Sequence, residues 1–200
     1  MTMIKLIIFD VGGVIDTFDE SQYIDYICKK LKIDPMKFRR ELIPKLDKME
    51  VDKMKLAKLK TDLSKKFGVS VKALEWGEAF LKLNSVNNDV VGLIGRLSKH
   101  YKIAVLTNVS RSRHMVKMEH YLEKVKYDAI FASCYLKMHK PDSRIYRFVL
   151  KKMNANPGET LFIDNLKRNT DGAKRLGINV IQFIGYGDLV NRLRKLGINC

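Results

Sequence analysis

The chain has 200 residues, of which 46% are apolar and 30% charged, a balance that excludes a largely disordered chain. This length favours a single domain with room for an inserted subdomain. No run of about 18 apolar residues occurs, so we expect no membrane-spanning helix, and the apolar stretch before Asp10 is too short for a secretion signal. Three widely spaced cysteines without a Cys/His cluster argue against a disulfide framework or a zinc site, and favour a reduced, cytoplasmic protein.

The net charge is the unusual part of the composition. Lys and Arg number 38 against 22 Asp and Glu, which gives +16. Residues 29–66 alone contain 14 Lys and Arg residues and 6 Asp and Glu residues. Such a field attracts anions, including phosphorylated substrates, nucleic acids and acidic membranes. The lysines alternate with apolar residues at helical spacing, so a solvated helix surface explains the same pattern more simply.

Strands and helices alternate along most of the chain. Five apolar runs rich in β-branched residues predict buried parallel strands at Ile4–Phe9, Lys102–Leu106, Ala129–Phe131, Thr160–Ile163 and Asn179–Ile184. Helical patterns are found at about 86–99, 111–124, 142–153 and 169–176, and Asp142 or Ser143 is a suitable N-cap for the third. This order predicts an α/β fold with a doubly wound parallel sheet and helices on both faces.

One long segment interrupts the alternation. From about residue 20 to residue 84 the sequence has helical patterns and no convincing strand, which is too long for a simple crossover. We therefore predict a helical subdomain at 15–86, inserted into an α/β core formed by 1–14 and 87–200. Ligands of such sheets bind beyond the carboxyl ends of the strands, so this insertion would cover the site as a cap. Trp76 is expected in the interior of the cap or at its contact with the core.

Polar residues follow the first two strands. Asp10 ends the first strand, where a carboxylate can act as a nucleophile, and Gly12 and Gly13 let backbone N–H groups approach an anion. Thr107 and Asn108 end the second strand, where a hydroxyl and an adjacent N–H can hold a phosphate oxygen. Each pair taken alone is compatible with an ordinary turn or strand-end cap.

Two further groups complete the pattern. Lys140, which precedes Pro141 at a helix start, can neutralise charge in a cleft, and the proline fixes the direction of the chain. Asp164 ends the fourth strand and is followed by Asn165, so an acidic strand end there can face a divalent cation.

In this order and spacing, the four motifs resemble those of the haloacid dehalogenase (HAD) superfamily, most of whose members are aspartate-nucleophile phosphatases. The resemblance spans nearly the whole chain, and the helical insertion is similar to that family's cap. The motifs that carry it are Phe9-Asp10-Val-Gly-Gly-Val, Leu106-Thr107-Asn108, Lys140-Pro141-Asp142, and Phe162-Ile163-Asp164-Asn165 through Gly172-Ala173.

The resemblance implies a role for each matching residue. Asp10 would attack phosphorus and form an aspartyl phosphate, while Thr107 and the Gly12–Gly13 backbone would bind phosphoryl oxygens. Asn108 would assist substrate binding, and Lys140 would balance the charge of the phosphoryl group.

The resemblance also implies a magnesium ion. It would be held by Asp10, the Gly12 carbonyl, Asp164 and Asn165, and would let a carboxylate approach an anionic phosphate. The substrate would be a small phosphorylated metabolite, and the protein a monomer or homodimer.

Two positions depart from the family pattern. Gly12 stands where most family phosphatases carry a second Asp, which protonates the leaving oxygen and is worth about 10²–10⁴-fold in rate. Asn165 stands where the family usually places a metal-binding Asp, so weaker metal affinity is expected. Asn165 could instead cap the following helix, and Asp16 could serve either the site or a turn.

Three functions remain open at this point. The first is a magnesium-dependent phosphatase with a weakened site. The second is metal-free dehalogenase chemistry, although such enzymes typically carry an aromatic residue at the Gly12 position and Asp at the Asn169 position. The third is a catalytically inactive protein whose basic cap binds nucleic acid or an acidic protein; no recognition motif in the sequence supports specific nucleic-acid binding.

Overall fold

A computed structural model describes residues 3–74 and 81–199, so Trp76 lies outside the described residues. The described strands are all parallel and form one sheet in the order β3-β2-β1-β4-β5, with β1 at its centre. They are β1 (Leu6–Phe9), β2 (Lys102–Thr107), β3 (Ala129–Ala132), β4 (Thr160–Asp164) and β5 (Asn179–Gln182). The predicted doubly wound parallel sheet is thereby confirmed, with all five strands in the expected segments.

Helices cover both faces of this sheet. They are α5 (Asn88–Leu97), α6 (Arg111–His120), α7 (Ser133–Leu136), α8 (Ser143–Met153), α9 (Lys167–Lys174) and α10 (Tyr186–Lys195), with short 3₁₀ turns η2 (Leu122–Lys124) and η3 (Pro157–Glu159). Asp142 is the N-cap of α8, as the sequence predicts. Helix α10 is not among the helices that the sequence predicts; its N-cap is Gly185, and no side chain caps it.

Strand β1 shows why the sheet is enclosed on both sides. All four of its residues are buried, and successive side chains point to opposite faces. Ile7 and Phe9 belong to the hydrophobic cluster that includes α5 and α10. Leu6 and Ile8 belong to the cluster that includes α8 and α9. A strand buried on both faces gives the continuous apolar run from which it was predicted.

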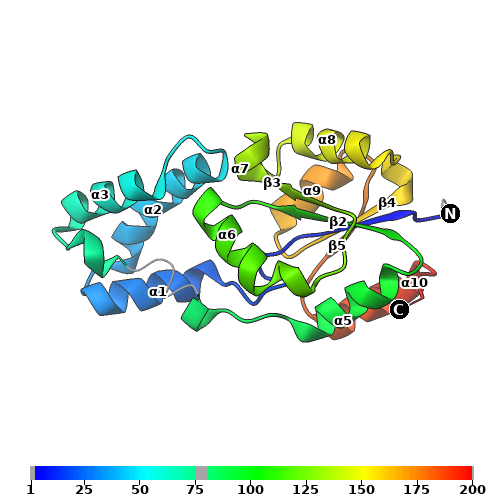
Figure 1. Cartoon of the computed structure of the whole chain (residues 1–200), viewed down its shortest axis with the longest axis horizontal. Coiled ribbons are helices and arrows are strands. Elements are labelled where there is room, and N and C mark those ends of the chain that lie inside the picture. Colours follow the sequence, from blue (N-terminus) through cyan, green and yellow to red (C-terminus); the bar gives the residue numbers. More distant parts are fainter. Residues whose placement is uncertain (1–2, 75–80, 200) are drawn as a thin grey trace.

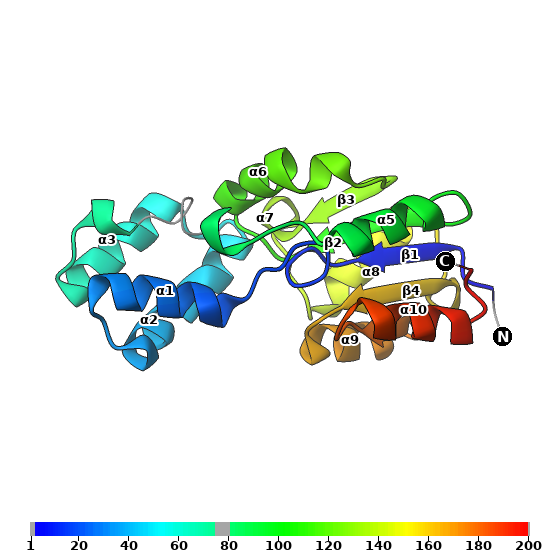
Figure 2. The same ribbon diagram turned by 90° about the horizontal axis from the view of Figure 1, so that it is seen from below.

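A separate group of helices lies between β1 and α5 in the chain. It comprises α1 (Glu20–Leu31), α2 (Pro35–Glu50), α3 (Leu56–Phe67) and the 3₁₀ turn η1 (Val71–Ala73). These helices have a hydrophobic cluster of their own, in which Ile24, Phe38, Leu42, Leu59 and Leu63 are buried. Figures 1 and 2 both show α1, α2 and α3 together at one end of the molecule, beyond the end of the sheet.

The two chain segments that join these helices to the α/β part run side by side. The Thr17 N–H donates to the Ser85 carbonyl at 3.0 Å, and the Asn87 N–H donates to the Ile15 carbonyl at 2.8 Å. Asp16 forms an isolated antiparallel bridge with Val86. The helical unit is therefore entered and left through one narrow two-stranded connection.

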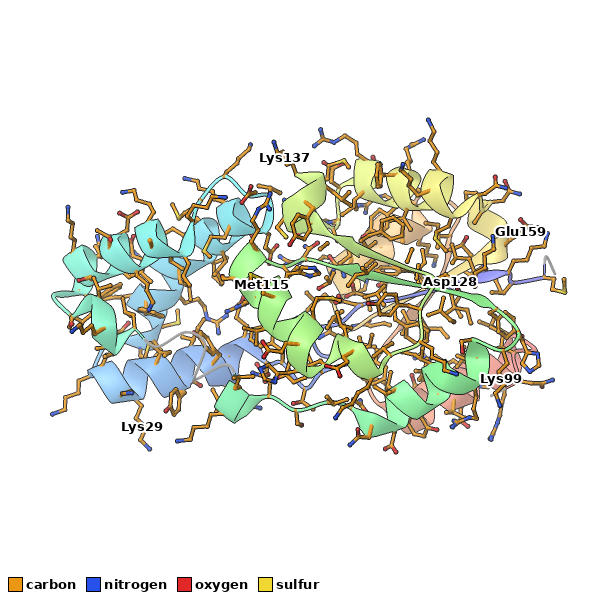
Figure 3. The ribbon with its side chains drawn as sticks, in the orientation of Figure 1. Lys29, Lys99, Met115, Asp128, Lys137 and Glu159 are labelled. Carbon is orange, nitrogen blue, oxygen red and sulfur yellow. The ribbon has the colours of Figure 1, made fainter. Side chains whose placement is uncertain are left out.

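Many of the chain's lysines lie on its outer surface, where Lys29 of α1 and Lys137 after α7 point away from the molecule (Figure 3). Within the helical unit several of them pair with acidic neighbours, such as Lys45 with Glu41 and Lys58 with Asp62. Within residues 3–74 and 81–199, no helix is long and apolar enough to cross a membrane.

Gly172 of α9 is the point where this helix meets the loop that carries Lys140. A Cβ atom there would lie 2.9 Å from the Pro141 Cβ and 3.0 Å from its carbonyl oxygen. We predict that Gly172→Ala lowers the free energy of unfolding by about 1–3 kcal/mol, because neither neighbour is a flexible side-chain end. Urea denaturation measures this change.

Gly95→Ala is the matched control, since Gly95 lies within α5 and a Cβ there meets nothing within 4 Å. It should raise the free energy of unfolding by about 0.5–1 kcal/mol through helix propensity. Equal effects of the two substitutions would contradict the proposed close packing at Gly172.

Candidate active site

Three charged side chains from separate parts of the sequence meet at the carboxyl edge of the sheet. The Lys140 ammonium lies 2.8 Å from Asp10 Oδ1 and 2.7 Å from Asp164 Oδ2. It also donates a hydrogen bond to the Leu106 carbonyl at 2.9 Å. All three charged residues are buried. One ammonium therefore contacts two carboxylates, so the group carries a net charge of about −1 when both are ionised.

The strand register explains this convergence. Strands β1 and β4 are neighbours, with Phe9 opposite Ile163, so the next residue of each strand is an adjacent carboxylate. The Asp10 N–H continues the ladder by donating to the Ile163 carbonyl at 2.9 Å. Because parallel strands end at the same edge, Asp10 and Asp164 share one side of the sheet.

The carboxylate of Asp164 is entirely enclosed by protein groups. Besides Lys140, it accepts hydrogen bonds from the Leu166 N–H at 2.8 Å and from Asn169 Nδ2 at 3.0 and 3.1 Å. Its side chain has no exposed surface. Asp164, which the sequence predicts to face a cation, pairs with Lys140 and is not among the residues that line the cavity; its role as a metal ligand stays a prediction.

Asp10 lies closer to solvent, with 8% of its side chain exposed. Its Oδ1 also accepts a hydrogen bond from the Val11 N–H at 2.7 Å. Burial raises the pKa of Asp10 to about 7; the charge of Lys140 opposes the shift and that of Asp164 adds to it.

A cavity of about 740 Å³ opens above this group. Of the residues selected from the sequence, five line it: Asp10, Gly12, Asn108, Lys140 and Asn165. Gly13, Thr107 and Asp164 are not among the lining residues. Thr107 is the last residue of β2 and is buried. The structure thus brings most of the expected site together, but it does not place the hydroxyl of Thr107 on the cavity wall.

Asn108 holds the backbone of the loop that carries Lys140. Its Nδ2 donates to the Lys140 carbonyl at 2.9 Å, and its Oδ1 accepts from the Lys140 N–H at 2.8 Å. The peptide bond between Lys140 and Pro141 is cis. This two-point contact ties the end of β2 to the segment that precedes α8.

The glycine turn after β1 is shaped by Asn165 and Asp16. Gly13 has a φ of 76°, and a Cβ there would lie only 2.3 Å from Asn165 Nδ2, so glycine is required. The Gly13 N–H donates to Asp16 Oδ1 at 3.1 Å. This contact engages a backbone donor that the sequence analysis assigned to phosphoryl oxygens.

Asn165 does not cap the following helix. The N-cap of α9 is Leu166, and no side chain caps it. Asn165 Oδ1 is instead buried without a hydrogen-bond partner among the described residues, as is Asn169 Oδ1. A buried amide oxygen without a donor is a candidate ligand for a cation or an ordered water.

Several charged residues that line the cavity were not predicted from the sequence. They include Glu50 at the end of α2, and Arg113 and Lys117 of α6. Arg113 and Lys117 are four residues apart, so one face of a helix after β2 carries both, and this spacing was the available signal. Burial raises the pKa of Glu50 to about 7, against the nearby charge of Arg113. Nothing in the sequence distinguishes Glu50 from other acidic residues of α2.

The family follows from a comparison with known proteins. The model of the haloacid dehalogenase-like hydrolase family matches residues 7–183. The chain belongs to this family. The resemblance noted in the sequence motifs is thereby confirmed.

Two curated relatives indicate the range of the family. D-ribitol-5-phosphate phosphatase of Bacteroides thetaiotaomicron is 26% identical over 198 residues, which are 90% of this chain and 92% of that protein. (S)-2-haloacid dehalogenase 4A of Burkholderia cepacia is 30% identical over 95 residues, or 46% of this chain. The matched segments span 39% of that dehalogenase, 39% of a sesquiterpene phosphatase from Aspergillus oryzae and 8% of mouse acyl-CoA dehydrogenase family member 10.

Solved structures show the same fold over the whole chain. A HAD family enzyme of Bacteroides thetaiotaomicron superimposes with a TM-score of 0.82 at 22% identity, covering 96% of this chain and 100% of that one. Its complex with magnesium and inorganic phosphate superimposes with a TM-score of 0.74 at 22% identity, covering 89% and 93% of the two chains.

Because Lys140 is buried between two carboxylates, we expect its replacement to have a large effect on the free energy of unfolding. Lys140→Met would leave Asp10 and Asp164 buried without their shared counter-ion, and should lower the free energy of unfolding by about 3–5 kcal/mol. Asp10→Asn, which keeps the shape and removes the excess negative charge, should change it by less than about 1 kcal/mol. Denaturant titration at neutral pH compares the two variants, and a small effect of Lys140→Met would contradict the arrangement.

Glu50 predicts a pH dependence of stability. A carboxyl group whose pKa is raised to about 7 in the folded state binds more protons than the unfolded chain does, so wild-type stability falls as the pH rises towards 7. Glu50→Gln lacks this group and so does not lose this stability. Relative to wild type, its free energy of unfolding should therefore rise by up to about 3 kcal/mol between pH 5 and pH 8. Glu119→Gln, at a side chain that is 76% exposed, controls for the loss of one charge. Parallel stability curves for wild type and Glu50→Gln would refute the prediction.

Proposed function

We propose that this protein is a phosphatase that hydrolyses the phosphoric monoester of a small metabolite. The observation that carries the proposal is the Asp10 carboxylate, which lies at the floor of the cavity with one oxygen held by Lys140 and Val11. A carboxylate in this position is a nucleophile with a fixed orientation. The similarity to D-ribitol-5-phosphate phosphatase across 90% of the chain supports phosphate esters as the substrate class.

In this proposal Asp10 attacks phosphorus and becomes an aspartyl phosphate, which water then hydrolyses. Lys140 offsets the charge of the phosphoryl group, and Asp164 and Asn108 hold Lys140 in place. Because the Lys140 ammonium is completely buried, its charge acts with little screening by water. Transfer to a nearby carboxylate therefore depends on positioning and charge rather than on a strong base.

Magnesium fits this site with a small set of ligands. No group of three or more His, Cys, Asp or Glu side chains in residues 3–74 and 81–199 could hold a metal alone. Asp10, Asn165 and Gly12 line the cavity; the Asp10 carboxylate, the buried and unpartnered Asn165 Oδ1 and the Gly12 carbonyl are suitable oxygen ligands. Magnesium commonly uses one or two carboxylates plus substrate phosphate and water. The ion would offset the charge between Asp10 and the incoming phosphate.

We further propose that the helical unit acts as a cap that selects the substrate. Its residues Glu20, Ser21 and Glu50 line the same cavity as Asp10 and Lys140. A volume of about 740 Å³ suits a small metabolite rather than a polymer.

The alternative is a catalytically inactive member of the family that binds an anion or an acidic partner. It is favoured by Gly12, which has no side chain, and by Asn165, which replaces an acid. A metal-free dehalogenase is a further alternative, supported by the partial similarity to (S)-2-haloacid dehalogenase 4A.

The phosphatase proposal predicts hydrolysis of p-nitrophenyl phosphate that requires Mg²⁺, stops with EDTA and is lost in Asp10→Asn. Asn165→Asp should bind Mg²⁺ more tightly, because it restores a negative charge, whereas Asn165→Ala should bind it more weakly. Calorimetric titration with Mg²⁺ measures this order without reference to turnover.

Turnover by wild type no greater than by Asp10→Asn would overturn the proposal. Halide release from 2-haloacids without metal would point to the dehalogenase instead. Mg²⁺ affinity that is the same in both Asn165 variants would remove Asn165 from the metal site.

A further inference from the structure

The cavity contains a lysine beside Gly12. A Cβ atom at Gly12 would lie 3.6 Å from Lys117 Nζ and 3.8 Å from the Phe18 ring. Both Gly12 and Lys117 line the cavity. The Lys117 ammonium of α6 thus lies within van der Waals distance of the point where a side chain at position 12 would begin.

This ammonium is held in place by a buried ion pair. Lys117 Nζ lies 2.7 Å from Asp16 Oδ2, and both side chains are at most 5% exposed. The other oxygen of Asp16 accepts hydrogen bonds from the Gly13 N–H at 3.1 Å and from the Phe18 N–H at 3.0 Å. Asp16 is therefore fixed to the turn after β1, and it fixes Lys117 to the same turn.

Lys117 and Lys140 act on Asp10 together. Lys140 contacts Asp10 Oδ1 directly, and the positive charge of Lys117 also lowers the pKa of Asp10, against the larger effect of burial. Lys117 comes from α6, and Lys140 from the loop that precedes α8. Lys140 contacts the carboxylates of Asp10 and Asp164, whereas the Lys117 ammonium contacts Asp16, which lies outside that group.

We propose that Lys117 is the catalytic acid of the phosphatase, contacting the leaving-group oxygen from beside Gly12. This inference rests on the proposed phosphatase function. An ammonium has three N–H donors, so a contact with Asp16 is compatible with a hydrogen bond to substrate. Asp16 is the positioning residue that holds it.

In this mechanism Lys117 loses one proton in the first step and regains one in the second. In the first step the bond from Asp10 to phosphorus forms as the ester P–O bond breaks, and Lys117 gives a proton to the departing oxygen, so that a neutral alcohol leaves. In the second step the neutral Lys117 amine takes a proton from the attacking water. The Asp10–phosphorus bond then breaks, which releases inorganic phosphate and restores the ammonium.

The test uses substrates whose leaving groups need this proton to different degrees. The full-length wild type and its variants are assayed for kcat/KM with p-nitrophenyl phosphate, phenyl phosphate and an alkyl phosphate. The main variant is Asp16→Asn with Lys117→Gln, which removes the buried pair without leaving a lone charge. It should lose about 10²–10⁴-fold on the alkyl ester and less than about tenfold on p-nitrophenyl phosphate, whose leaving group is stable without a proton.

A second variant keeps the test decisive if the double variant does not fold. Lys117→Arg retains a charge that can pair with Asp16, but a guanidinium does not release its proton. It should fold and show the same selective loss on the alkyl ester. Glu50→Gln is assayed in parallel, because Glu50 is a cavity carboxyl group whose pKa is raised to about 7 and could itself supply a proton.

Three results would contradict the proposed role of Lys117 or the function on which it rests. A loss by the Lys117 variants that is equal for all three esters would overturn the proposal while leaving the phosphatase intact. A selective loss on the alkyl ester in Glu50→Gln alone would also overturn it and would assign the acid to the cap. A wild type that hydrolyses none of the esters above the Asp10→Asn level would overturn the phosphatase function itself.

Discussion

The site depends on one ammonium group buried between two carboxylates. Lys140 has no exposed side-chain surface, yet it is held within hydrogen-bond distance of Asp10, Asp164 and a backbone carbonyl. Burying a lone charge costs several kcal/mol, so this arrangement is stable only because each of the three groups compensates the others. The same ion pairs that compensate these buried charges also fix the orientation of the Asp10 carboxylate at this edge of the sheet.

A second ion pair connects the site to the helical unit. Asp16 lies in the connection between β1 and α1, and it binds both the glycine turn and Lys117 of α6. It also bridges to Val86, where the chain leaves the helical unit. A displacement of the helices relative to the sheet would therefore act on Asp16 first. Through its two contacts the position of the helical unit is linked to the groups around Asp10.

The sequence was most informative where local patterns and topology coincide. Apolar runs predicted all five strands, and parallel pairing then required Asp10 and Asp164 to end at the same edge. It was least informative where a contact depends on how separate helices pack. Lys117 and Glu50 are distant from Asp10 in the chain, and only the placement of α6 and α2 brings them to the cavity. Helix α10 follows the last element predicted from the sequence and begins after Gly185, without a capping side chain.

The two departures from the family pattern have a common electrostatic consequence. Gly12 and Asn165 each stand where an acid is usual, so the cavity has fewer negative charges to repel a phosphate dianion. Lys117 adds a positive charge at one of these two points. A site of this composition would offset part of the charge of a phosphate with its own cations, beside the proposed metal ion. Tighter binding of phosphate in the ground state would not by itself raise the rate. A group that acts only as the ester bond breaks would raise the rate, and the acid role proposed for Lys117 beside Gly12 is of this kind.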